Sequence, residues 1–484
     1  MINLLLCCSI FSVNIVPQNV FWDHYTIIPP LGQIKSLATS PFHVYAINDN
    51  YLLFLNKQTL NLEKTFYFDQ EIDLVGYDGW YNDLWISQVD NMIRFTIASY
   101  STREYAIPDK VNRFGIDQDY VYLASSKNYS LNKRTGEVKI TNSFPENIKW
   151  YKKISGADIR NYAFLTPYYY YDEPSESQAP FYQFPITALY DDGMDLYVGT
   201  DGYGILKYNK VSWQKQRVTY GPLDSRIKRI RKFDNKIYFV SPSGISYYIA
   251  TTGNWKYQRF THRVVDLLPL KNHFIISFEN RVSRIDGGIA FTLSNFPTDI
   301  LSLGQDEECV YVGTRSGLFK IIKGTDVPIP FGPDRYSVHA VYPTADAIFV
   351  CGDFAVYKYN RKENRWSKVL NYGVKDIVEL KDELYLLGVN NQLIKYHTLQ
   401  GDVSSADTNW ILLPYFNIYD IDTDGEVLYC ASYAGIYYYE PDTELYKVIY
   451  NLPRVKYDYI FVVDENIVTV SNKVIYRLPI EYRD

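Results

Sequence analysis

The chain has few of the side chains from which metal centres and nucleophilic sites are built. Its 484 residues include six histidines, five cysteines and three methionines. No two histidines stand at metal-ligand spacing and no Cys-x-x-Cys pair occurs, so a zinc site has no support. The sequence also lacks a Gly-x-Ser-x-Gly nucleophile elbow, a Walker-type loop and a dinucleotide fingerprint. We therefore expect no metal and no cofactor, and we nominate no catalytic residue.

Long basic runs and an excess of positive charge are missing as well. The 49 Lys and Arg residues are outnumbered by 55 Asp and Glu residues, which gives a formal net charge of -6. Proteins that bind nucleic acid neutralise phosphates with clustered cations, so this balance argues against nucleic acid as a partner.

Long hydrophobic runs are absent except for residues 4–13, which are too few to cross a bilayer but fit the core of a signal peptide. No Lys or Arg precedes this run and no cleavage site is clear, so a buried N-terminal strand is the alternative. Cys7 and Cys8 would suit lipidation, although Leu6 stands where a small residue is expected. We predict that residues 1–20 are a leader, that no segment spans a membrane, and that the protein is secreted, periplasmic or at the cell surface.

Three cysteines remain beyond this leader, and each lies in or beside an apolar run: Cys309, Cys351 and Cys430. An odd number of widely separated cysteines is not a disulfide framework. We expect them to pack as small hydrophobic side chains.

Tyrosine, in contrast, is abundant, with 48 copies, and many of them belong to a repeat. Every 36 to 44 residues, two apolar residues three apart are followed by an apolar-aromatic-apolar triplet, as in "ITALYDDGMDLYVGT" from Ile186. Clear copies begin at Ile34, Ile72, Val111, Ile186, Ile227, Val264, Ile300, Val338, Val374 and Ile418, and a worn copy begins near Tyr457. The gap after Val111 is nearly double, so we place a degenerate twelfth unit at Tyr151, Ile154 and the triplet Asn161-Tyr162-Ala163.

Each unit contains alternating apolar runs separated by turn residues, which indicates three to four antiparallel strands. No segment has a helical period of 3.6 residues. One such unit cannot bury both faces alone, so it must pack against copies of itself. Repeats of this length and strand content predict an all-β fold, a β-propeller of about twelve units.

Propellers usually hold four to eight blades, so twelve units favour two rings. The segment "FWDHYTIIPPLGQ" before the first unit resembles an outer strand, and pairing it with the last unit would close a ring. We predict one propeller from residues 21–185 with 451–484 and a second, about seven-bladed propeller from residues 186–450. The chain would cross between rings in residues 166–184. Two rings of six units and one large ring are the alternatives.

Two units resemble the two-component-regulator propeller repeats of bacterial extracellular sensors. The resemblance is carried by "LYVGTDGYGILKYN" (residues 196–209) and "VYVGTRSGLFKII" (residues 310–322). It implies an extracellular β-propeller. The kinase and DNA-binding modules of typical members have no counterpart here, so we expect a free-standing propeller.

Candidate binding residues follow from the position of loops in a propeller, because the loop after each triplet and the loop entering each unit emerge on one face. These loops and the Tyr-rich insertion carry the candidates Tyr168, Tyr169, Tyr170, Tyr171, Asp201, Tyr203, Arg315, Asp353 and Tyr433. Tyrosine is a large, rigid contact residue that also forms hydrogen bonds. The alternative for the four consecutive tyrosines is packing at the junction between rings.

For two further segments we prefer a structural interpretation to a functional one. "DIDTDGE" (residues 420–426) imitates a calcium loop, but Ala431 stands where a bidentate Glu is required, so we predict a turn. His339 follows a strand start and could face a channel, where a hydrogen-bonded structural role is the usual one.

These patterns together predict a non-catalytic binding or scaffold protein whose propeller-face loops bind a protein, peptide or glycan. A carbohydrate-active enzyme, a glycosidase or lyase, is one alternative, and converging carboxylates in a central channel would favour it. A component of a cell-surface or secretion assembly is the other, and an exposed apolar-aromatic patch would favour that.

Overall fold

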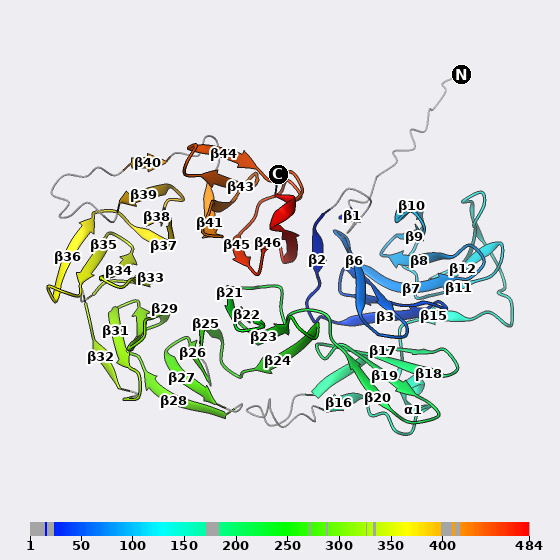
Figure 1. Ribbon diagram of the computed structural model, residues 1–484. Helices are drawn as coiled ribbons and strands as arrows, with labels where there is room; N and C mark the ends of the chain where they lie inside the picture. The colour runs from blue at the N-terminus through cyan, green and yellow to red at the C-terminus, as the bar shows by residue number, and fades with distance from the viewer. Residues whose placement is uncertain are drawn as a thin grey trace, which may run out of the picture. The chain divides into compact units, whose positions relative to one another are not determined.

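The computed structural model describes residues 15–16, 24–170, 183–270, 273–286, 289–325, 327–332, 335–397, 409–411 and 417–483. Two compact units are present (Figure 1). The N-terminal unit comprises Met1–Trp22, Leu31–Tyr169 and Gln183–Val218, and the C-terminal unit comprises Asp23–Pro30, Tyr170–Tyr182 and Thr219–Asp484. Most of the predicted leader and Tyr171 lie outside the described residues. Within the described part, no helix has the length and apolar character needed to cross a membrane.

The C-terminal unit consists of seven four-stranded antiparallel sheets. Six follow in chain order: β21–β24 (Arg229–Phe233, Lys236–Ser241, Gly244–Ile249, Asn254–Arg259), β25–β28 (Val264–Pro269, Phe274–Phe278, Arg281–Asp286, Ile289–Asn295), β29–β32 (Ile300–Gln305, Cys309–Thr314, Gly317–Ile322, Pro328–Pro330), β33–β36 (Val338–Pro343, Ala347–Gly352, Val356–Asn360, Arg365–Leu370), β37–β40 (Val374–Leu380, Glu383–Gly388, Leu393–His397, Asn409–Ile411) and β41–β44 (Ile418–Thr423, Leu428–Ser432, Gly435–Glu440, Leu445–Val448). The seventh contains β45 (Tyr459–Val463), β46 (Asn466–Ser471), β47 (Val474–Pro479) and, from the start of the chain, β2 (Thr26–Ile28). A short 3-10 helix, η2 (Ile480–Tyr482), follows.

These seven sheets form a closed ring. The first strands β21, β25, β29, β33, β37, β41 and β45 contact one another in that order, and β45 contacts β21 (Figure 1). Strand β2 pairs with β47 through Thr26↔Arg477, Ile27↔Tyr476 and Ile28↔Ile475. The unit is therefore a seven-bladed β-propeller in which the predicted pairing of the first strand with the last unit closes the ring.

The N-terminal unit contains four sheets with antiparallel pairing. They are β3–β6 (Ile34–Thr39, His43–Asn48, Tyr51–Asn56, Leu62–Phe68) with β1 (Ile15–Val16), β7–β10 (Ile72–Asp78, Asp83–Gln88, Asn91–Thr96, Ser101–Ala106), β11–β14 (Arg113–Ile116, Tyr120–Ala124, Asn128–Asn132, Val138–Ile140) with β15 (Trp150–Lys152), and β16–β20 (Tyr168–Tyr170, Gln183–Asp191, Asp195–Thr200, Ile205–Asn209, Lys215–Val218). First strands β17, β3 and β7 lie next to one another, and β7 contacts β11 and β15.

The degenerate twelfth unit is not a sheet, which corrects the prediction. Strand β15 pairs with β11, and the chain then turns into helix α1 (Gly156–Arg160). Ser155 and Asp158 form a capping box that starts this helix. Tyr162 follows the helix instead of lying in a strand, so the described residues form eleven sheets and not twelve.

The two units also have bounds different from those predicted. The sheet that contains the Ile186 repeat belongs to the N-terminal unit, and the Tyr457 repeat belongs to the C-terminal unit. The physical reason is the closure: seven consecutive repeats from β21 to β47 complete a ring with β2, without any sheet from the N-terminal unit.

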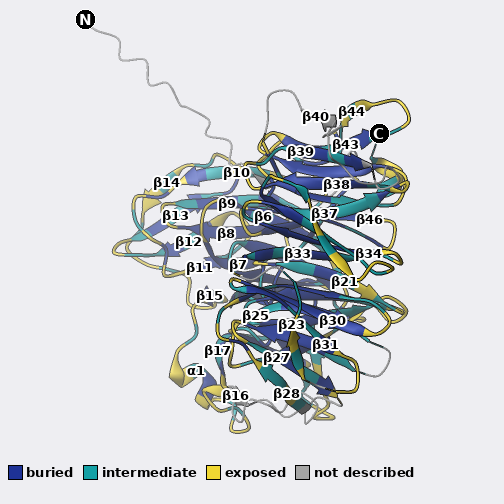
Figure 2. Cartoon of the chain, turned by 90° about the vertical axis from the view of Figure 1, so that its left-hand side faces the viewer, coloured by how far each residue is buried: buried dark blue, intermediate teal, exposed yellow. Residues whose placement is uncertain are grey.

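The middle residue of the triplet, aromatic in most repeats, lies in the second strand of its sheet and is mostly buried; Trp85, Tyr197 and Tyr429 have no exposed surface. In three sheets a turn aspartate accepts a hydrogen bond from the tyrosine hydroxyl five residues later: Asp117 from Tyr122 (2.8 Å), Asp306 from Tyr311 (2.7 Å) and Asp424 from Tyr429 (2.8 Å). Asp424 also accepts the Glu426 and Val427 amides, so residues 420–426 form the predicted turn. Figure 2 shows that buried residues follow the strands and exposed residues follow the turns.

The Gly-Thr pair after the triplet has a packing explanation, seen at Gly313 and Thr314. A Cβ at Gly313 would lie 2.7 Å from Val338 of the next sheet, so only glycine permits this approach. Thr314 Oγ1 donates to the Gly317 carbonyl (2.8 Å) and closes the turn, and Gly317 has a φ of 142°.

Candidate functional site

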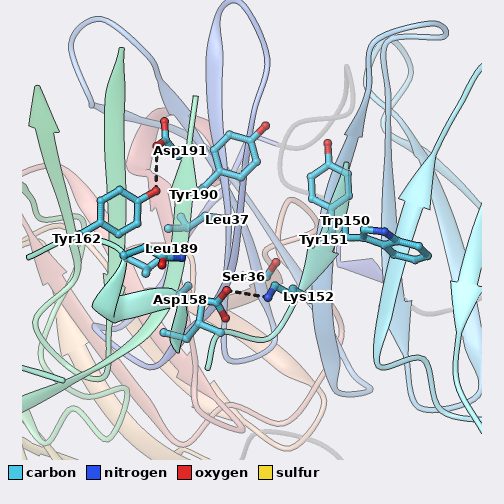
Figure 3. A pocket seen from close by; sticks show the side chains of 13 residues that line it. Ser36, Leu37, Trp150, Tyr151, Lys152, Asp158, Tyr162, Leu189, Tyr190 and Asp191 are labelled. Atoms are coloured by element: carbon cyan, nitrogen blue, oxygen red, sulfur yellow. Dashed lines mark hydrogen bonds and ion pairs between the residues drawn. The ribbon is translucent and has the colours of Figure 1, made fainter. Parts of the chain in front are cut away.

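A cavity of about 160 Å³ lies in the N-terminal unit, where the segment of β15 and α1 takes the place of a sheet (Figure 3). Strand β3 supplies Ser36 and Leu37, residues 150–162 supply the β15 and α1 side, and β17 supplies residues 188–191. We call it the N-terminal pocket. It lies where a strand and a five-residue helix interrupt the series of four-stranded repeats.

Three tyrosines line the N-terminal pocket in a row: Tyr151, Tyr162 and Tyr190 (Figure 3). Tyr151 is buried, stacks on Phe114 with ring centroids 5.3 Å apart, and donates its hydroxyl to the Tyr77 carbonyl (3.1 Å). The rings of Tyr151 and Tyr190 are nearly parallel with centroids 6.4 Å apart. Stacking therefore fixes one aromatic wall of the pocket.

One end of the pocket is an ion pair between Lys152 Nζ and Asp158 Oδ1 at 2.7 Å (Figure 3). The hydrogen bond from Lys152, with those from Ser155, lowers the pKa of the Asp158 carboxyl to about 2. Asp158 is therefore ionised at any physiological pH.

The other end is a hydrogen bond from the Tyr162 hydroxyl to Asp191 Oδ2 at 2.9 Å (Figure 3). Lys210 Nζ also binds Asp191, at 2.9 Å and 3.0 Å from its two oxygens. Partial burial would raise the pKa of Asp191, but the bonds from Lys210, the Gly193 amide and Tyr162 lower it. Burial and then the bond to Asp191 raise the pKa of Tyr162 to about 12, so its hydroxyl keeps its proton.

This arrangement suits binding better than acid–base chemistry. A general acid needs a carboxyl that holds a proton near neutral pH, yet Asp158 and Asp191 both have lowered pKa values. Ionised carboxylates are strong hydrogen-bond acceptors, and aromatic rings offer flat apolar faces. The pocket can therefore hold a small polar group by stacking and by hydrogen bonds.

The predicted site residues of the N-terminal unit do not meet in this pocket. Tyr203 is buried, with Phe184 at 4.9 Å between ring centroids and the Arg217 guanidinium at 3.5 Å from its ring, so it is not available to a ligand. Asp201 is exposed in the turn after β18 and forms a bridge with Gln33. Tyr168 is exposed in β16, and the side chains of Tyr169, Tyr170 and Tyr171 lie outside the described part. Their role in ligand contact stays a prediction.

The predicted residues of the C-terminal unit occupy equivalent turns between second and third strands. Arg315 pairs with Asp299 (2.9 Å) and Asp353 pairs with His339 Nε2 (2.5 Å), while the Tyr433 side chain is 65% exposed. His339 thus has a hydrogen-bonded role. These turns occupy equivalent positions on three different sheets of the ring.

Carboxylates do converge at the inner strands of the C-terminal unit, the condition that would favour an enzyme. Asp266 and Asp420 are buried, however, and Asp420 Oδ2 accepts the Ile460 amide of the next sheet (2.9 Å). Asp266 Oδ2 lies 3.4 Å from the Leu303 amide in the same way. Burial, followed by repulsion from Asp376, raises the pKa of Asp420. These carboxylates fasten one blade to the next and are not presented to a ligand.

The N-terminal unit exposes large apolar side chains in turns that join first to second and third to fourth strands: Phe42, Trp80, Met194, Val211 and Trp213. In a propeller blade these turns share one face. Trp80 is 65% exposed and Trp213 is 61% exposed. We call this set the N-terminal apolar face; it is opposite to the face on which the sequence placed the candidate loops.

Sequence reasoning missed Tyr190, Asp191 and Asp158 as pocket residues. A usable signal was the interruption of the repeat itself, because a missing sheet leaves space in a ring. The "SGAD" segment, with Ser155 and Asp158 at capping-box spacing, was the local sign of a helix.

The sequence matches no family model and no curated protein. Among solved structures it is similar to the extracellular domain of the putative hybrid two component system BT4673 from B. thetaiotaomicron, with 11% identity and a TM-score of 0.46 over 92% of this chain and 75% of that chain. It is also similar to PorZ, an essential surface component of the type-IX secretion system of Porphyromonas gingivalis (12% identity, TM-score 0.34, 92% and 79% covered), and to BamB from Moraxella catarrhalis (11%, 0.42, 60% and 95%). Similarity at this level gives no argument about function, and the β-propeller assignment rests on the sheet order of the chain itself.

Proposed function

We propose that the chain is a non-catalytic binding protein whose N-terminal pocket holds one sugar residue of a glycan. The observation that carries this proposal is the pairing of a tyrosine wall, Tyr151, Tyr162 and Tyr190, with two ionised carboxylates, Asp158 and Asp191. A sugar ring offers an apolar face for stacking and hydroxyl groups that donate to carboxylates.

The size of the pocket limits the bound part of the ligand. Its volume of about 160 Å³ is below the 300–1,000 Å³ typical of sites for drug-sized molecules. One ring fits this volume better than an extended chain, so the rest of the glycan would lie outside the pocket. The leader-like residues 4–13 support a place of action outside the cytoplasm, where surface glycans are found.

The test is isothermal titration calorimetry of the full chain against neutral and acidic oligosaccharides. Tyr190→Ala should weaken binding at least tenfold because it removes half of the stacked wall. Tyr120→Ala changes an exposed tyrosine in the sheet that contains β15 but outside the pocket lining; it is the control and should leave affinity unchanged.

Three results would contradict the proposal. The first is that no oligosaccharide binds. The second is that Tyr190→Ala has the same affinity as the unchanged chain. The third is that the oligosaccharide is cleaved on incubation. New reducing ends or unsaturated products would show a glycosidase or lyase, the enzymatic alternative.

A second function, partner docking within a surface assembly, is favoured by the N-terminal apolar face. Five large apolar side chains exposed on one face exceed the scattered single residues of ordinary surfaces. A photoreactive residue in place of Trp80 or Trp213 should crosslink to one partner in intact cells, and one in place of Val89, which is 52% exposed in a turn between second and third strands, should not. Absence of crosslinks from both tryptophan positions would exclude docking through this face.

A further inference from the structure

A cavity of about 520 Å³ lies in the C-terminal unit where the last sheet of the ring meets the first. Residues 225–228 before β21 form one side, and Asp458, Tyr459 and the β46–β47 turn form the other. Pro242 and Arg263 complete the lining. We call it the closure pocket. Its volume is within the range of small-molecule sites.

Cations dominate this lining. The cationic side chains are Arg226, Lys228, Arg263 and Lys473, and the lining contains one carboxylate, Asp458. Ion pairs join Arg226 to Asp224, Arg263 to Glu279 and Asp458 to Lys456. Together these groups have a local excess of two positive charges, in a chain whose net charge is -6. The pocket is therefore a positive site on an acidic protein, which attracts anions.

Two of the cationic groups, Lys228 and Arg263, are held loosely enough to contact a ligand, while Arg226 is bound by Asp224. Lys228 Nζ donates to a neutral acceptor, the Tyr459 hydroxyl, at 2.9 Å, so its charge is not neutralised by that bond. The Arg263 and Glu279 side chains are both more than half exposed and 3.9 Å apart, beyond hydrogen-bond distance. Asp224 accepts from Nε and Nη2 of Arg226, and the Arg226 side chain is 59% exposed.

We propose that the closure pocket binds the phosphate group of a small phosphorylated ligand. Guanidinium groups match the oxygens of phosphate in geometry, and an ammonium adds a point charge. The Tyr459 hydroxyl accepts a hydrogen bond from Lys228, and its own O–H can be donated to a ligand oxygen. A local excess of two charges matches a phosphomonoester dianion. This site is separate from the N-terminal pocket and does not depend on its function.

The test is calorimetric titration of the full chain with inorganic phosphate, and in parallel with sulfate, acetate and chloride, all at one ionic strength. Phosphate should bind saturably and more tightly than the other anions. Arg263→Gln should weaken phosphate binding at least tenfold, and Lys228→Met should do the same. Lys362→Met changes an exposed lysine paired with Asp346 and is the matched control, with unchanged affinity expected.

Equal heats from phosphate and chloride would show ionic screening alone and overturn the proposal. Tighter binding of acetate than of phosphate would overturn the phosphate assignment in favour of a carboxylate. Unchanged phosphate affinity in Arg263→Gln would place binding elsewhere; this side chain is exposed, so its loss should not prevent folding. A melting curve of each variant without anion identifies any loss of fold.

Discussion

The two units use the same repeat but complete their structures differently. In the C-terminal unit seven sheets close through hydrogen bonds between β2 and β47. In the N-terminal unit four sheets are completed by β15 and α1, which reach β17 through the Tyr162–Asp191 bond and the Tyr151–Tyr190 stack. Closure by strand pairing gives a ring of seven four-stranded blades, whereas the strand and helix of the N-terminal unit interrupt the series of sheets beside the N-terminal pocket. A break in a regular repeat is thus a place to look for a site.

The largest difference between the two units should come from removing a buried ion pair that stabilises the N-terminal unit alone. Lys133 Nζ lies 2.6 Å from Asp78 Oδ2, and both side chains are almost fully buried. Asp78 also accepts from Trp85 Nε1. Lys133→Ala leaves the carboxylate buried without its cation, so we expect a loss of about 3–5 kcal/mol.

Hydrogen exchange measured by mass spectrometry should locate this loss in β3–β14 and leave β21–β47 protected. Lys139→Ala removes an exposed pair with Glu137 in the same sheet and should change nothing measurable. Equal loss of protection in both units would show that they unfold as one cooperative body.

The second largest effect should come from a substitution in β2, the strand that closes the C-terminal ring. Ile27 of β2 is 2% exposed, and Ile27→Ala should destabilise the C-terminal unit by about 2–4 kcal/mol through the lost burial and the cavity left behind. The faster hydrogen exchange should appear in β45–β47 and β21. Thr26→Val, at the neighbouring position, keeps the size of the side chain and is the control. Retained protection of β47 in Ile27→Ala would mean that the ring does not depend on β2.

Acidic groups of the C-terminal unit should give it a pH dependence of its own. Burial raises the pKa of Asp422 to about 6, although the Val462 and Thr423 amides lower it in part. An unfolded aspartate has a pKa near 3.9, so the folded state binds more protons between about pH 4 and pH 6. Stability from this group is therefore present at low pH and is lost as the pH rises through about 6, by about 3 kcal/mol.

Urea unfolding at several pH values should show this decline in the unchanged chain and a flatter profile in Asp422→Asn. The difference between the two profiles cancels the other titrating groups. If the stability of the unchanged chain relative to Asp422→Asn rose with pH, the pKa of Asp422 would be lowered instead of raised. If this difference in stability stayed constant, the pKa of Asp422 would not be shifted.

Much of the fold follows from the sequence because its causes are local. The Gly-Thr pair, the turn aspartates and the buried tyrosines act within one sheet or between neighbours, so each copy of the repeat reports them. The sequence predicts that the strand at Thr26 pairs with the last unit, but it does not give the number of repeats that this pairing encloses in one ring. Every repeat has the same local pattern whichever ring it joins.

The candidate site was harder to predict for a related reason. The N-terminal pocket combines residues 36–37, 150–162 and 188–191. The strands that carry these residues have the same sequence pattern as the strands of other repeats. Of the loop residues predicted instead, Tyr203 suits the composition of a binding surface but lies buried, whereas Asp201, Arg315 and Tyr433 are exposed. Composition identifies which side chains can bind, and the space left by packing decides which of them do.

The smallest predicted effect links the interrupted repeat to the pocket. Ser155 caps α1, accepting the Asp158 amide, while Asp158 accepts the Ser155 amide (2.7 Å). Ser155→Ala should cost about 1 kcal/mol, confined to α1 because that helix is mostly exposed. Exchange of amides 156–162 should become about fivefold faster while global unfolding stays unchanged. Oligosaccharide affinity should fall with it, because Asp158 and Tyr162 lose their fixed positions, and Ser155→Thr, which keeps the cap, should restore both. Faster exchange with unchanged affinity would separate the helix from the binding site.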